Sequence, residues 1–86
     1  MKKTVESGPR NQIGRRVRLA HLRCSPPASQ EDLAGRLAAR GITIDRSAVS
    51  RIESRTRYLT DYEISAIARS LKVSVAWLFA ETEERR

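Results

Sequence analysis

Two short segments with helical spacing, residues 29–38 and 46–53, constrain the fold more than any other feature of the chain. The apolar residues of the first segment recur at intervals of three and four: Leu33, Ala34, Leu37 and Ala38. Ser29 stands where a helix N-cap belongs, and Gly41 is a natural stop after the last turn. Two amphipathic helices joined by a glycine-containing turn must pack against further helices to bury their apolar sides.

The second segment has two chemically different faces. Asp45 stands at its N-cap position, and Ala48, Val49 and Ile52 form the predicted inward side. The opposite side is basic and hydroxylic: Arg46, Ser47, Ser50 and Arg51. This arrangement suits a helix that enters the major groove of DNA, where an arginine bound to guanine through two hydrogen bonds contributes about 1–3 kcal/mol of base discrimination.

Three further helices are predicted around this pair. The first covers residues 11–23 and ends at the prolines of Ser-Pro-Pro, residues 25–27. The next opens with Thr-x-x-Glu at residues 60–63, a capping box, and Ser74 caps a short last helix over about residues 75–82. Their predicted inward residues are Ile13, Val17 and Ala20, then Ile64, Ile67, Ala68 and Leu71, then Leu78 with either Trp77 or Phe79.

Five helices without a convincing strand predict an all-α fold, a compact bundle of short helices that contains a helix-turn-helix. Ile42 and Ile44 alternate with a threonine, but three residues are too few for a strand, so we expect a turn that plugs the core. The predicted organisation is a flexible N-terminal arm at 1–10, the domain at 11–82 and a frayed tail at 83–86.

Charge is unevenly distributed along the chain. The net charge is +7, and residues 1–60 hold 13 basic and 5 acidic side chains (+8), whereas residues 61–86 hold 4 and 5 (−1). A positive field on the part that carries the helix pair favours a polyanionic partner. Cys24 is the single cysteine, no long apolar run occurs and no secretory signal is visible, so we expect a cytoplasmic, nucleoid-associated protein that does not engage the membrane.

The order of these motifs resembles the lambda-repressor-like helix-turn-helix family, also called the xenobiotic-response-element (Cro-like) type, over roughly residues 12–80. The motifs are Ile13-Gly-x-x-Val17, Ser29-Gln30-x-x-Leu33-Ala34, Val49-Ser50-x-Ile52-Glu53 and Ile67-Ala-x-x-Leu71. The resemblance implies that Arg46, Ser47, Ser50 and Arg51 read bases. It also implies that Gln30, Arg55, Thr56 and Arg57 bind DNA phosphates, and that Glu53 pairs with a basic residue of the first helix.

The chain departs from the family pattern in three places. The span from Gln30 to Glu53 is longer than usual, so we expect a longer second helix and a wider turn. Ser54-Arg55 replaces the usual Asn-Gly, so a residue other than glycine must make that turn. His21 stands where the pairing arginine is expected; it either pairs with Glu53 or faces solvent, in which case Arg18 or Arg23 takes the pairing role.

The sequence therefore predicts a DNA-binding transcriptional regulator, a repressor that binds an inverted repeat of double-stranded DNA as a homodimer. Two alternatives stay open: an antitoxin-like or scaffold module with an unidentified protein partner, and a nonspecific nucleic-acid binder. No serine has a histidine and a carboxylate at triad spacing, and no glycine-rich phosphate loop occurs, so no enzyme activity and no cofactor are expected. One histidine and one cysteine do not make a metal site.

Overall fold

The computed structural model describes residues 8–24 and 27–80. This part of the chain contains five helices and no strand: α1 (Gly14–Arg23), α2 (Gln30–Ala38), α3 (Arg46–Glu53), α4 (Asp61–Leu71) and α5 (Val75–Phe79). The predicted all-α fold class is confirmed. The first seven residues of the predicted arm and the whole predicted tail lie outside the described residues.

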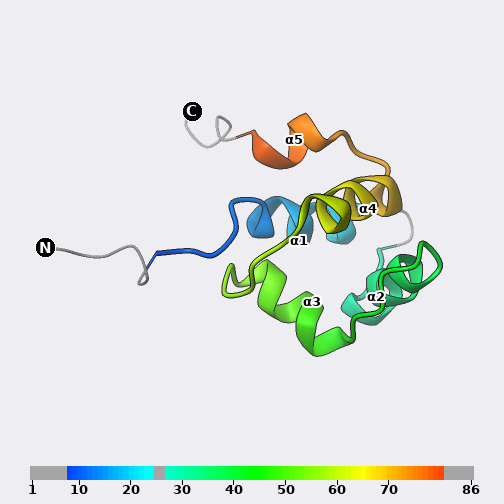
Figure 1. Ribbon diagram of the computed structural model, residues 1–86. Helices are drawn as coiled ribbons and strands as arrows, with labels where there is room; N and C mark the ends of the chain where they lie inside the picture. The colour runs from blue at the N-terminus through cyan, green and yellow to red at the C-terminus, as the bar shows by residue number, and fades with distance from the viewer. Residues whose placement is uncertain (1–7, 25–26, 81–86) are drawn as a thin grey trace, which may run out of the picture.

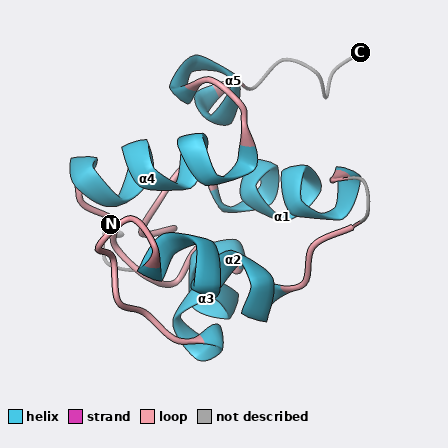
Figure 2. Ribbon diagram, turned by 90° about the vertical axis from the view of Figure 1, so that its right-hand side faces the viewer, coloured by secondary structure: helices cyan, strands magenta, loops and turns pink. Residues whose placement is uncertain are grey.

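The helices lie in three tiers (Figures 1 and 2). α1 and α4 form the middle tier, α5 lies on one side of them, and α2 with α3 lies on the other side. α2 and α3, joined by residues 39–45, form the helix-turn-helix, and α3 packs on both α1 and α2. α1 and α2 therefore support α3 from two sides.

The core lies where the tiers meet. Its fully buried large side chains are Ile13, Val17, Leu33, Leu37, Val49, Ile52, Ile67 and Leu78, which come from every helix or from its N-cap. Each fills a position of the helical spacing in the sequence. Ile42 and Ile44, from the connection between α2 and α3, pack on the edge of this core, as predicted.

Side-chain caps fix where four helices begin. Ser29 and Thr60 each form a capping box with the carboxylate three residues later, Asp32 and Glu63. In the α3 cap, the Asp45 carboxylate accepts a hydrogen bond from the Ala48 amide. At α5, the Ser74 hydroxyl accepts one from the amide three residues on. These four helix starts agree with the sequence predictions, because each cap satisfies an amide that the first turn leaves unpaired.

Three boundary or burial predictions are wrong. α1 begins at Gly14 rather than Asn11, because the Asn11 side chain accepts hydrogen bonds from the amides of Ile13 and Gly14 and so acts as a cap ahead of the helix. Ala38 is exposed: it is the last residue of α2, and its single methyl group does not reach a neighbouring helix. α5 ends at Phe79, because Ala80 takes extended backbone.

Candidate nucleic-acid interface

The outer face of α3 is polar and open to solvent. Arg46, Ser47, Ser50 and Arg51 are all exposed. The other side of the same helix is buried, with no more than 5% of each residue exposed: Ala48, Val49 and Ile52. Among the described residues, no salt bridge holds either arginine against the protein. The two guanidinium groups are therefore available to a ligand.

A buried polar cluster fixes the C-terminal end of α3. Glu53 Oε2 lies 2.6 Å from His21 Nε2, and both side chains are about 95% buried. Gln30 Nε2 donates to Glu53 Oε1 at 3.0 Å. One carboxylate thus connects α1, α2 and α3. The residue of α1 that pairs with Glu53 is therefore His21, and not Arg18 or Arg23.

Hydrogen bonding also sets the form of the His21 ring. Its Nδ1 lies 2.7 Å from the Ala28 carbonyl oxygen, which only accepts, so Nδ1 carries a hydrogen. The other ring nitrogen, Nε2, faces Glu53 Oε2 at 2.6 Å, and this buried contact joins α1 to α3. A buried pair of this kind orients its residues more than it stabilises the fold.

Asn11 ties the start of α1 to the end of α3. Its Nδ2 donates to the carbonyl oxygens of Ile52 (3.1 Å) and Arg57 (2.9 Å), while its Oδ1 caps α1. The close approach requires Gly14, because a Cβ atom there would lie 2.2 Å from the Ile52 oxygen. Sequence reasoning missed Asn11, although an asparagine just before an apolar-periodic segment is a cap signal.

Arg55 itself makes the turn that follows α3. Its φ of 67° is left-handed, and two bonds, Arg55 N to Ile52 O and Thr56 N to Arg51 O, complete a Schellman motif. The Arg55 guanidinium Nε donates back to the Asn11 carbonyl oxygen at 3.3 Å. This bond holds the side chain over the turn that glycine usually makes.

The rest of the predicted phosphate loop is also held internally. Arg57 forms a two-pronged contact with the Glu63 carboxylate, both bonds 3.3 Å long, and Thr56 lies 3.0 Å from the Ser54 hydroxyl. Burial raises the pKa of Glu63, but hydrogen bonds from the Thr60 amide and from Arg57 outweigh it and leave that pKa lowered. A guanidinium has five N–H donors, so Arg57 keeps some free for a ligand.

The arginines of α1 serve different purposes. The Arg16 guanidinium lies 4.2 Å from the centre of the Trp77 ring and donates to the Trp77 carbonyl oxygen, which attaches α5 to α1. Arg15 and Arg18 are exposed. Tyr58 is 67% exposed beneath the Arg10 guanidinium, so it does not cap the core.

The described residues contain no group of three or more histidine, cysteine or acidic side chains that could hold a metal ion. Within the same residues, none of the helices has the length and apolar character needed to cross a bilayer. The arrangement is thus a rigid helical support with one exposed, basic and hydroxylic helix face.

This combination defines an all-helical domain with the architecture of a transcription factor. The structure is similar to the crystal structure of the hypothetical transcription factor NHTF from Neisseria, with a TM-score of 0.71 and 25% sequence identity. The similarity covers 99% of this chain and 90% of that chain. The sequence matches no protein-family profile and no curated protein.

Proposed function

We propose that the chain is a sequence-specific DNA-binding transcriptional regulator of the lambda-repressor-like type, and that it acts as a repressor. The observation that carries this proposal is the outer face of α3, whose four polar residues are exposed while its apolar side is buried. A helix anchored in this way presents base-reading side chains to a major groove. The similarity to NHTF, a hypothetical transcription factor, supports the same class.

In this proposal Arg46 and Arg51 bind guanines through paired hydrogen bonds, and Ser47 and Ser50 read neighbouring bases directly or through water. The phosphate contacts come from the ends of the supporting elements. They are Gln30, Arg55, Thr56 and Arg57. Gln30 uses one amide hydrogen for Glu53 and keeps the second for a phosphate.

The binding unit we propose is a homodimer on an inverted repeat, in a cytoplasmic protein associated with the nucleoid. One α3 offers a short contact surface, and two-fold pairing doubles it. Val75 and Phe79 on α5 are 42% and 40% exposed and offer apolar surface to a second copy. α5 lies on the side of the middle tier away from α2 and α3, so pairing through α5 leaves α3 uncovered (Figure 1).

Selection of bound duplexes from a random pool, followed by affinity measurements at two salt concentrations, tests the proposal. Arg51→Ala should reduce the preference at one base-pair position by about 1–3 kcal/mol. Arg57→Ala should weaken binding to all sequences similarly and flatten the salt dependence. Arg18→Ala is the matched control, because it removes the same charge from an exposed position on α1 and should leave base preference intact.

The possible failures point to different functions. Weak binding of every duplex, with equal losses for Arg51→Ala and Arg18→Ala, identifies a nonspecific nucleic-acid binder. Absence of DNA binding at low salt supports an antitoxin-like or scaffold module that recognises a protein. Either result refutes base reading by α3.

A further inference from the structure

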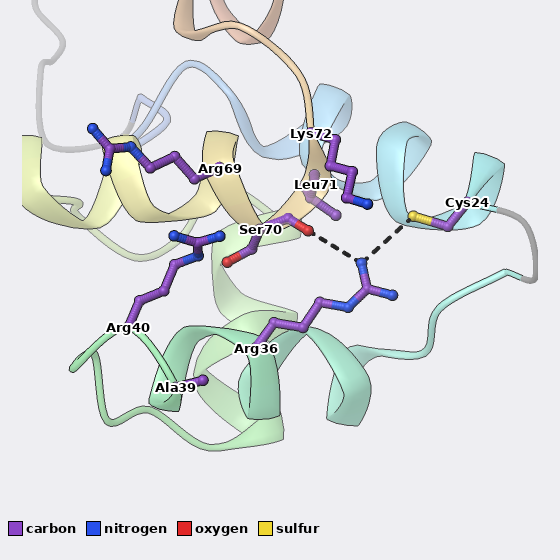
Figure 3. A pocket seen from close by; sticks show the side chains of 8 residues that line it. All are labelled: Cys24, Arg36, Ala39, Arg40, Arg69, Ser70, Leu71 and Lys72. Atoms are coloured by element: carbon purple, nitrogen blue, oxygen red, sulfur yellow. Dashed lines mark hydrogen bonds between the residues drawn. The ribbon is translucent and has the colours of Figure 1, made fainter.

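A basic pocket lies between the C-terminal parts of α2 and α4, and no residue of α3 or of the 55–57 loop lines it. Its charged lining residues, shown in Figure 3, are Arg36, Arg40, Arg69 and Lys72. No acidic residue is part of the lining. The volume is about 810 Å³, within the range of about 300–1,000 Å³ that small-molecule sites occupy.

The protein neutralises only about half of this charge. Each helix C-terminus carries about half a negative charge, so the ends of α2 and α4 together offset about one of the four cations. Arg36 Nη1 donates to the Ser70 carbonyl oxygen at 3.1 Å, which holds that guanidinium in place at the pocket. Asp32 lies one turn before Arg36 and interacts with it, but it lies outside the pocket. Even when Asp32 is counted against Arg36, about two positive charges therefore stay without a counter-charge in a concave site.

A second observation points to a ligand. Ser70 is 95% buried, yet its hydroxyl oxygen has no hydrogen-bond partner. Buried hydroxyls without partners are uncommon, because each loses its hydrogen bonds to water. Figure 3 shows this oxygen on the side of α4 that faces α2, toward the space that the arginines surround.

We propose that this pocket binds a small phosphorylated molecule. Planar guanidinium groups match the geometry of phosphoryl oxygens. Arg36 approaches from α2, Arg69 from α4 and Arg40 from the turn that follows α2. The Ser70 hydroxyl supplies a further donor. Ala39 and Leu71 give the pocket apolar walls against which the organic part of such a ligand packs. This inference is independent of the proposed DNA binding, because it concerns different residues.

Titration of the full chain with pyrophosphate, followed by calorimetry and by amide chemical shifts, tests the site. We expect saturable one-to-one binding with a dissociation constant of about 1 mM or tighter. We also expect the amide chemical shifts of Ser70, Leu71 and Lys72 to change. Arg40→Gln and Arg69→Gln should each weaken binding about tenfold, the loss expected for one charge-assisted hydrogen bond. Arg18→Gln, an exposed arginine of α1 outside the pocket, should bind like the parent protein.

Ser70→Ala separates ligand binding from folding. Because the hydroxyl has no partner in the protein, its removal should leave the unfolding midpoint unchanged or higher while pyrophosphate binding weakens severalfold. The proposal is overturned if Ser70→Ala and Arg40→Gln bind like the parent. It is also overturned if Arg18→Gln weakens binding as much as Arg40→Gln, since that result indicates general charge attraction. Competition by duplex DNA for the same amide shifts would assign the pocket to nucleic-acid phosphates instead.

Discussion

Gly14→Ala should destabilise the domain, because α1 and α3 touch backbone to backbone at this residue. An added Cβ atom would lie 2.2 Å from the Ile52 carbonyl oxygen, 3.0 Å from the Glu53 oxygen and 2.8 Å from Arg55 Cγ. The Ile52 oxygen has little freedom to move, since it accepts hydrogen bonds from Asn11 Nδ2 and from the Arg55 amide. The helices must therefore separate by about 1 Å to restore an ordinary contact.

The magnitude follows from three terms. Overpacking of this kind destabilises by about 1–3 kcal/mol. Loss of the Asn11 bond to Ile52 adds about 1 kcal/mol. Alanine loses less backbone entropy on folding than glycine, which offsets about 0.5–1 kcal/mol of this destabilisation. The net expectation is a loss of about 1–3 kcal/mol in unfolding free energy, and a fall in Tm of roughly 4–8 °C for each kcal/mol.

Gly35→Ala is the matched control. It is the same chemical change inside α2, but no heavy atom lies within 4 Å of the added Cβ. We expect it to raise the unfolding free energy by about 0.5–1 kcal/mol. Urea denaturation of the three proteins, read by far-UV circular dichroism, compares them directly. A backbone contact at Gly14 is excluded if Gly14→Ala is as stable as the parent, or if both substitutions change stability in the same direction.

Two further predictions concern charged groups. His21→Ala leaves the buried Glu53 side chain without its contact partner on α1 and should lower the unfolding free energy by about 3–5 kcal/mol, measured by urea denaturation; a loss under about 1 kcal/mol would contradict this role of His21. The folded-state pKa values of Asp32 and Glu63 are lowered, so both carboxylates stabilise the fold above their ordinary values of 3.8 and 4.5, and this stability is lost as the pH falls through the folded values. The urea midpoint should therefore decline below about pH 4.5, and Glu63→Gln should reduce the decline; a midpoint independent of pH in this range would exclude it.

Helix starts were predictable because their signals are local. A hydroxyl or carboxylate followed three residues later by a carboxylate, as at Ser29 and Thr60, fixes a cap whatever the rest of the chain does. The exposed face of α3 was predictable for the same reason, since helical spacing separates Arg46 and Arg51 from the buried Val49. These local patterns gave the all-α class and the candidate helix.

Contacts between distant segments were not predictable in the same way. Asn11 bonds to residues more than forty positions away, and nothing near it in the sequence names those partners. The role of Gln30 beside Glu53 depends on how α2 lies against α3, which the periodicity of either helix leaves open. Predicting the internal bonds of Arg57 likewise requires the position of α4, where Glu63 lies.

Three helices of the domain end in the same way, and the residues at their ends differ in kind. α2, α3 and α4 each finish with a left-handed residue and a Schellman pair of bonds: Gly41, Arg55 and Lys72. A residue with a side chain costs about 1 kcal/mol more than glycine at such a position. Replacing Arg55 and Lys72 by glycine should therefore yield a domain with a higher unfolding free energy and a lower positive charge. A positive charge thus stands at two positions where the backbone favours glycine, one in the candidate phosphate loop and one in the basic pocket.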